Sequence, residues 1–145
     1  MDRKLRTICK RIMQVTGHEV GNLRIQKLLY FIQAYTLVKF GCPAFEAEIE
    51  AWPYGPVVPE VYFAYKNNYF LDSLEAEIQL DSGVEEAIVT IVNAFRDWKD
   101  FQLVDLTHSY ETWSNKISSL YNDREITKKE IKDFHYKKNL DGGIF

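Results

Sequence analysis

The hydrophobic pattern of this chain changes sharply at residues 45–52. Apolar and polar or aromatic side chains alternate there, in the order Phe45, Glu46, Ala47, Glu48, Ile49, Glu50, Ala51 and Trp52. Such alternation is typical of a strand with one buried and one exposed face, because successive side chains of a strand point to opposite sides. Pro53, Gly55 and Pro56 then end the strand, since they fix the backbone and the prolines lack amide donors.

Apolar residues at helical spacing occupy most of the rest of the chain. This spacing predicts helices over about 3–16, 23–40, 59–67 and 83–98, a broken helical stretch over 101–120, and a last helix that begins near 128. The helix over 23–40 is apolar on more than one face, so we expect it at the centre of the fold. Helix caps are predicted at Asn22, at Ser82 in Ser82-Gly83-Val84-Glu85, and at Thr127 in Thr127-Lys128-Lys129-Glu130.

A second alternating stretch, residues 76–81, is predicted to pair with the first strand. A lone two-stranded ribbon is marginal, so it must pack on the helices. The length of 145 residues suits one domain. We therefore predict an α+β fold, a mainly helical single domain with about six helices and a small antiparallel two-stranded ribbon over residues 1–140, followed by a flexible C-terminal tail at 141–145. The predicted core contains Leu28, Leu29, Ile32, Ile88, Ile91 and Phe95.

The chain carries no recognisable motif for catalysis or metal binding. Cys9 and Cys42 lie far apart and are expected to be buried free thiols, and the three histidines are scattered, so neither a metal nor a cofactor is expected. Asp105, His108 and Ser109 are neighbours in sequence, but the members of a catalytic triad meet in space rather than in sequence. We predict that the protein is not an enzyme.

Charge is distributed unevenly along the chain. Residues 1–39 have a balance of +6, residues 40–95 a balance of −9, and residues 96–145 are neutral, for a net charge of −3. The acidic middle argues against general nucleic-acid binding and suits a basic partner, although acidic stretches are also common as plain solvated surface. A basic stripe at Arg3, Arg6 and Lys10 is the alternative contact for phosphate. Without a long apolar stretch, we expect a cytoplasmic protein with no membrane partner.

The segment Trp52-Pro53-Tyr54-Gly55-Pro56-Val57 is a rigid aromatic turn. One interpretation is a buried corner of the fold, and the other is an anchor for a partner protein, because rigid aromatic side chains concentrate binding energy. The predicted partner-binding residues are Glu46, Glu48, Glu50, Trp52 and Tyr54.

Three segments of the chain share their motifs with one family. They are Gln26-Lys27-Leu28-Leu29-Tyr30, the pair Glu50-Ala51-Trp52 and Tyr54-Gly55-Pro56-Val57, and a looser segment with Thr107, His108 and Trp113. In these segments the chain resembles the Panacea, or SocA-like, antitoxin family, formerly phage-associated proteins of unknown function. Thr112 stands where the family tends to have proline, and Glu111 is displaced by one position. The motif residues with an expected structural role are Gln26, Lys27, Leu28, Leu29, Tyr30, Gly55, Pro56, Val57, Thr107, His108 and Trp113.

The resemblance implies a protein-binding module of a bacterial or prophage toxin–antitoxin system. It implies that the module neutralises a protein toxin, encoded by a neighbouring gene, through direct contact and without enzymatic activity. Two alternatives stay open: a proteolytic adaptor that delivers a toxin to a protease, and a phage accessory protein with a DNA-binding role. We expect no nucleic-acid partner for the isolated chain.

Overall fold

A computed structural model describes residues 1–67, 78–118 and 123–145. These ranges form seven helices and three short strands, and the predicted α+β, mainly helical fold is confirmed. The elements in chain order are α1 (Arg3–Thr16), α2 (Asn22–Phe40), β1 (Ile49–Trp52), β2 (Gly55–Val57), α3 (Pro59–Lys66), α4 (Ser82–Ala94), α5 (Asp100–His108), α6 (Glu111–Ile117), β3 (Glu125–Ile126) and α7 (Lys128–Leu140).

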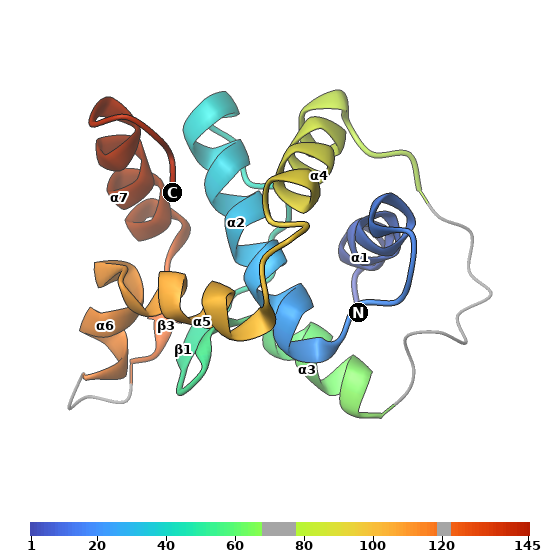
Figure 1. Cartoon of the computed structure of the whole chain (residues 1–145), viewed down its shortest axis with the longest axis horizontal. Helices are drawn as coiled ribbons and strands as arrows, with labels where there is room; N and C mark the ends of the chain where they lie inside the picture. The colour runs from blue at the N-terminus through green and yellow to red at the C-terminus, as the bar shows by residue number, and fades with distance from the viewer. Residues whose placement is uncertain (68–77, 119–122) are drawn as a thin grey trace.

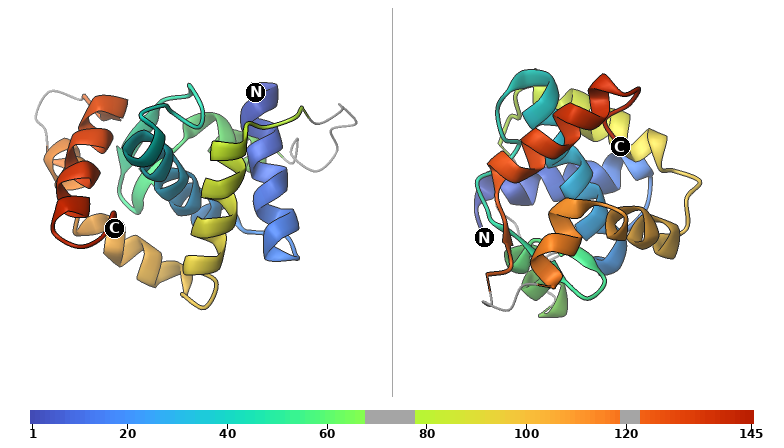
Figure 2. Two further views of the ribbon diagram at one scale, coloured as in Figure 1. Left: turned by 90° about the horizontal axis from the view of Figure 1, so that it is seen from above. Right: turned by 90° about the vertical axis from the view of Figure 1, so that its left-hand side faces the viewer.

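Helix α2 lies at the centre of the molecule, as predicted. It lies between α7 and α4, and α1 packs on the other side of α4 (Figures 1 and 2). Every residue of α2 from 25 to 37 is buried, polar ones included. Its apolar residues cover more than one face, as a helix enclosed on several sides requires, and its buried polar residues Gln26, Lys27 and Gln33 form hydrogen bonds with other segments. The predicted core residues are all buried, namely Leu28, Leu29, Ile32, Ile88, Ile91 and Phe95.

The helix caps were predicted with mixed success. Thr127 caps α7 as expected, with Thr127 Oγ1 accepting from Glu130 N at 3.1 Å and Glu130 Oε1 accepting from Thr127 N at 3.3 Å. The predicted caps at Asn22 and Ser82 were wrong, because both helices begin one residue earlier than expected. Asn22 instead uses its side chain in the tertiary structure, where Asn22 Nδ2 donates to Tyr62 O at 3.3 Å.

The strands form a three-stranded antiparallel sheet in the order β2-β1-β3. The strand predicted over 45–52 is observed only for Ile49–Trp52. Its predicted partner at 76–81 was wrong: residues 78–81 form no strand, and 76–77 lie outside the described residues. The two-residue turn Pro53-Tyr54 instead folds β2 directly back onto β1, so that Trp52 lies opposite Gly55. Pro56 is tolerated in β2 because β2 is an edge strand.

The last two residues pack on the core of the fold. The ring of Phe145 lies 5.3 Å from that of Phe31, and Ile144 O accepts a hydrogen bond from His135 Nδ1 at 2.6 Å. These contacts hold the end of the segment that the sequence predicts as a flexible tail, while the domain limit at residue 140 stays a prediction.

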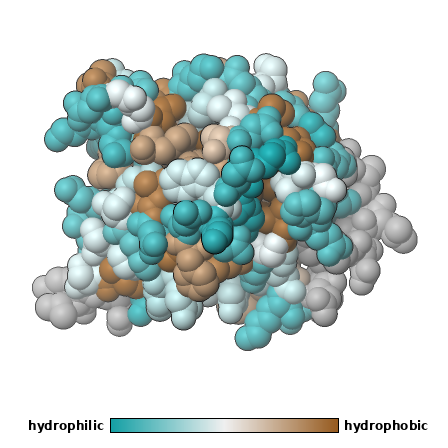
Figure 3. Space-filling view, viewed as in Figure 1, coloured by the Kyte–Doolittle hydropathy of each residue, from teal (hydrophilic) through white to brown (hydrophobic). Residues whose placement is uncertain are grey.

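The surface mixes hydrophilic and hydrophobic areas, as Figure 3 shows for one face. Cys9 is buried and free, as predicted, whereas Cys42 is free but exposed, because it lies in the loop after α2. In the part of the chain that the structure describes, no helix has the length and apolar character needed to cross a membrane.

Candidate partner-binding surface

The hairpin β1–β2 is the point where the three motif segments of the sequence meet. From α2, Lys27 Nζ donates to Pro56 O at 3.0 Å. The neighbouring Gln26 Oε1 accepts from Val58 N, the amide just after β2, at 2.7 Å. The motif residues of α2 therefore hold the returning strand of the hairpin.

The other side of the hairpin is held by α5 and α6. His108 Nε2 donates to Pro53 O at 3.0 Å, and Trp113 Nε1 donates to Trp52 O at 2.8 Å. The rings of His108 and Trp113 are stacked, with their centroids 3.9 Å apart. Both carbonyl groups at the start of the turn, the half-buried one of Trp52 and the exposed one of Pro53, thus receive a side-chain donor.

Gly55 is the tightest point of this arrangement. Its φ of +108° lies in the region that favours glycine, and an added Cβ would lie 2.7 Å from Thr107 Oγ1 and 2.8 Å from Lys27 Cε. Any side chain at this position would therefore collide with the two residues that pack the hairpin against α2 and α5.

Lys27 has an unusual environment for a lysine. Its side chain has no exposed surface, and burial lowers its pKa to about 7, because an apolar environment disfavours the charged form. Among the described residues, no carboxylate forms an ion pair with it. The backbone carbonyl of Pro56 is the hydrogen-bond acceptor of this amine.

A second buried polar group joins α2, α6 and α7. His135 Nδ1 donates to Ile144 O, so the neutral ring accepts at Nε2 from Tyr30 OH at 2.8 Å. The same hydroxyl of Tyr30 pairs with Thr112 Oγ1 at 2.7 Å. Burial lowers the pKa of His135 to about 4, and burial raises the pKa of Tyr30 above its ordinary value. This network ties the last helix to the central one.

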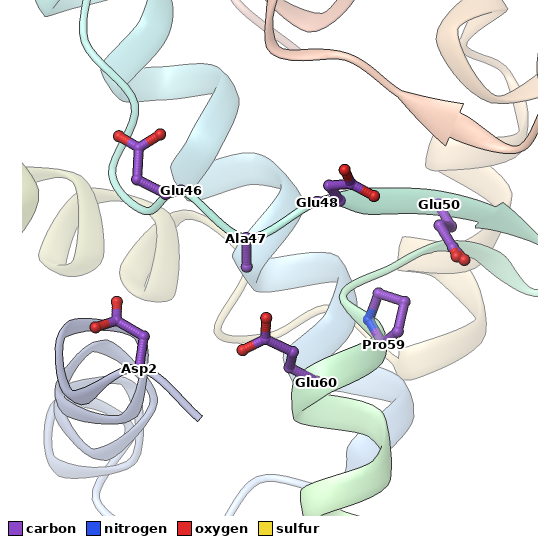
Figure 4. Close-up of a pocket in the computed structure, with 7 residues that line it drawn as sticks. All are labelled: Asp2, Glu46, Ala47, Glu48, Glu50, Pro59 and Glu60. Carbon is purple, nitrogen blue, oxygen red and sulfur yellow. The ribbon is translucent and has the colours of Figure 1, made fainter.

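The predicted acidic residues lie on one open groove. The structure adds Asp2 and Glu60 to Glu46, Glu48 and Glu50, and the groove has a volume of about 740 Å³ (Figure 4). Asp2, Glu46 and Glu60 come from the start of α1, the loop before β1 and the start of α3, and the carboxylate of Glu46 points away from the other two (Figure 4). Sequence reasoning missed Asp2 and Glu60, because they come from helix starts far from the strand. We call this surface the acidic groove.

The two predicted aromatic anchors differ in exposure. Trp52 is half-buried, and its ring lies 4.9 Å from that of Tyr62. Tyr54 is 62% exposed at the tip of the hairpin, with its ring 6.4 Å from that of Phe101. The hairpin therefore combines a packed corner and an exposed aromatic tip, although a partner contact for either residue stays a prediction.

The neighbouring residues of the supposed triad do not converge. Ser109 Oγ donates to Leu106 O at 2.6 Å, and His108 is engaged with the turn carbonyl of Pro53. Within residues 1–67, 78–118 and 123–145, no group of three His, Cys, Asp or Glu side chains could hold a metal ion.

Comparison with known proteins confirms the resemblance drawn from the motifs. A family model described as "Antitoxin SocA-like, Panacea domain" matches residues 25–114, from α2 to α6, and includes all three motif segments. Antitoxin SocA of Caulobacter vibrioides is 45% identical over 49 residues, which is 34% of this chain and 26% of that protein. The match thus spans about a quarter of that relative's length. No solved structure was found to match the chain.

Proposed function

Because the chain belongs to the SocA-like, Panacea domain family of antitoxins, we propose that it neutralises a protein toxin by direct contact. The match over residues 25–114 carries this proposal, since it includes the hairpin and the helices that hold it. The proposed toxin is encoded by a neighbouring gene, and the two proteins meet in the cytoplasm.

The acidic groove is the proposed site of the first encounter with the toxin. Its lining includes five carboxylates contributed by the N-terminus, the segment leading through β1, and α3. Like charges gathered on one open surface speed the approach of an oppositely charged partner, an effect that salt weakens. A toxin with a basic surface fits this groove best.

Tyr54 is the proposed anchor that retains the toxin. It is rigidly placed, because the turn is held by α5 and α6, and it is exposed. An aromatic side chain that is already fixed loses little conformational freedom when it is covered by a partner, so it contributes strongly to affinity.

Co-expression tests the proposed function. The neighbouring gene expressed alone should arrest growth, and co-expression with this chain should restore it. The two proteins should then purify together, with a total buried interface of about 1,600 Å². The proposal would be contradicted if the product of the neighbouring gene still arrested growth during co-expression and did not purify with this chain. Tight binding of the isolated chain to its own operator would instead favour the DNA-binding alternative.

Binding kinetics test the two proposed contacts separately. The double variant Glu46→Lys with Glu48→Lys should slow association and reduce its salt dependence. The control pair Asp97→Lys with Asp105→Lys makes the same change of net charge at exposed residues outside the groove and should have little effect. Unchanged association of the groove variant, in folded protein, would place the encounter elsewhere.

Loss of the anchor should affect dissociation. Tyr54→Ala should speed dissociation of the toxin, whereas Tyr136→Ala, at an exposed tyrosine on α7, should not. Equal dissociation rates for wild type and Tyr54→Ala would show that the exposed tip is not an anchor.

A further inference from the structure

A small pocket lies between the start of α2, the turn of the hairpin and α3. It has a volume of about 170 Å³, and a protein cavity of about 150 Å³ holds one benzene molecule. The pocket therefore has room for one aromatic or large aliphatic side chain. Most of the residues that line it are apolar or aromatic, namely Leu23, Trp52, Pro53, Tyr54, Val57 and Tyr62.

The polar side chains that border the pocket serve the fold. Asn22 Nδ2 donates to Tyr62 O at 3.3 Å, and Gln26 Nε2 donates to Asn22 Oδ1 at 2.9 Å. Gln26 Oε1 accepts from the amide that follows β2, and the ammonium of Lys27 donates to Pro56 O at 3.0 Å. Because these groups hold α2, α3 and the hairpin together, what the pocket offers to a partner is its apolar surface.

The pocket adjoins the acidic groove. Glu50 lines the groove and Trp52 lines the pocket, and the two alternate residues lie on the same face of β1, about 7 Å apart. Val57, which also lines the pocket, lies directly opposite Glu50 in the antiparallel pairing. Residues in that position have Cβ atoms about 5 Å apart. The apolar pocket and the carboxylates thus form one continuous surface across β1 and β2.

The two parts of this surface select different groups of a partner. Leu23, Trp52 and Tyr62 are half-buried, so an apolar group that covers them removes apolar surface from water. The neighbouring carboxylates repel an anion, such as a nucleotide or an acidic peptide, and attract lysine or arginine. Exposed ion pairs add little affinity, so the apolar contact retains the partner and the carboxylates select it.

We infer that the pocket receives one large apolar side chain of the toxin, from a segment that places lysine or arginine two or three positions away, against Glu50. The inference rests on the proposed function and adds the chemistry of the toxin segment. Tyr54, the proposed anchor, forms one wall of the pocket, so the inserted side chain packs against it. The same exposed ring then contacts the toxin on two sides.

Three matched peptides test the inference on the isolated chain. In extended acetyl-Lys-Ala-Phe-Ala-Lys-amide, the phenylalanine and both lysines share one face at about 7 Å spacing, which matches the spacing of Glu50 and Trp52. In heteronuclear NMR this peptide should shift the indole N–H signal of Trp52. It should bind about tenfold more tightly than the peptide with glutamate in place of both lysines, and about tenfold more tightly than the peptide with alanine in place of phenylalanine.

The inference is overturned by equal affinities in either comparison, or by signals that move only outside the pocket. It is also overturned if the peptide with lysine and phenylalanine does not bind at millimolar concentration.

Filling the pocket tests the apolar contact. Leu23→Trp, on the pocket wall, should weaken binding of the lysine and phenylalanine peptide at least tenfold. Leu140→Trp makes the same change at a leucine of α7 that is 69% exposed, and it should leave binding unchanged. Wild-type affinity in folded Leu23→Trp would refute insertion into the pocket. If that variant does not fold, the three peptides on the wild-type chain still decide.

Neutral variants test the selection by charge. The double variant Glu48→Gln with Glu50→Gln should reduce the preference for the lysine peptide over the glutamate peptide about threefold or more. The control pair Asp97→Asn with Asp105→Asn removes the same charge at exposed residues outside the groove and should keep the preference. An unchanged preference in the groove variant would refute the role of these carboxylates.

The complex with the toxin separates this inference from the proposed function. Leu23→Trp should weaken toxin binding about tenfold, and Leu140→Trp should not. Growth rescue together with wild-type toxin affinity in folded Leu23→Trp refutes the pocket as a toxin contact and leaves the antitoxin role intact. Selective peptide binding by a wild-type chain that does not rescue growth refutes the antitoxin role alone.

Discussion

Replacing Gly55 by alanine should destabilise the protein far more than the same change at another glycine with positive φ. An L-residue held at positive φ costs about 1–2 kcal/mol. At Gly55 the new Cβ would also lie 2.7 Å from Thr107 Oγ1 and 2.8 Å from Lys27 Cε. Both side chains are fully buried, so the new Cβ could be accommodated only by displacing packed atoms. Overpacking of this kind costs about 1–3 kcal/mol more.

Displacement of Lys27 adds a further loss. The ammonium would move away from Pro56 O, and a hydrogen bond from a charged donor contributes about 1.5–3 kcal/mol. The expected total for Gly55→Ala is therefore about 3.5–8 kcal/mol, a large part of the 5–15 kcal/mol by which typical domains are stable. The hairpin should be the region that loses its structure first.

Gly17→Ala is the matched control for the backbone contribution. Gly17 has a φ of +94°, and an added Cβ there would meet nothing within 4 Å. Its expected loss is the backbone cost alone, about 1–2 kcal/mol. Urea denaturation followed by circular dichroism gives both free energies of unfolding.

Equal losses in the two variants, within about 0.5 kcal/mol, would refute the reasoning, since the close approach at Gly55 would then cost nothing. A double-mutant cycle locates the effect. Thr107→Ala removes one of the two colliding groups, so the loss caused by Gly55→Ala should be smaller in that background.

Three further predictions concern stability. The free energy of unfolding should fall by about 3 kcal/mol between pH 6.5 and pH 4, because an unfolded histidine binds a proton in this window and His135, with its pKa lowered to about 4, does not. Urea denaturation at several pH values should give a smaller fall for His135→Gln than for the wild type. An identical fall in the two proteins would contradict this prediction. The free energy of unfolding should rise from pH 7 to about 9, because Lys27, with its pKa lowered to about 7, has released a proton that the unfolded chain retains. The same series of denaturation measurements on Lys27→Met should lack this rise. Thr127→Ala should cost about 1 kcal/mol in urea denaturation through loss of the cap of α7, and an unchanged midpoint would contradict that role.

Much of the local structure follows from sequence pattern. The bounds of α1, the enclosed character of α2 and the cap at Thr127 were all predicted, because helical spacing and capping depend on residues within a few positions of one another. The change of period at residues 45–52 likewise indicated β1, although the strand is shorter than the alternation.

The candidate site was only partly predictable. Glu46, Glu48 and Glu50 were found because they lie in one alternating segment, and the motifs brought Lys27 and Gly55 to attention. No sequence signal placed these two residues in contact or showed that the lysine is buried. Asp2 and Glu60 joined the acidic groove only in three dimensions.

The sequence by itself determined where helices form, which faces are apolar, where the one clear strand lies and to which family the motifs belong. The tertiary structure alone decided that β1 pairs with β2 and β3, and that Lys27 is enclosed beside a pocket with aromatic residues in its walls. It also decided that the side chain of Asn22 donates a hydrogen bond to Tyr62 O instead of capping a helix. The reason is physical: helix spacing and caps are satisfied between near neighbours in the chain, whereas strand pairing and the burial of a charge depend on which distant segments the packed core brings together.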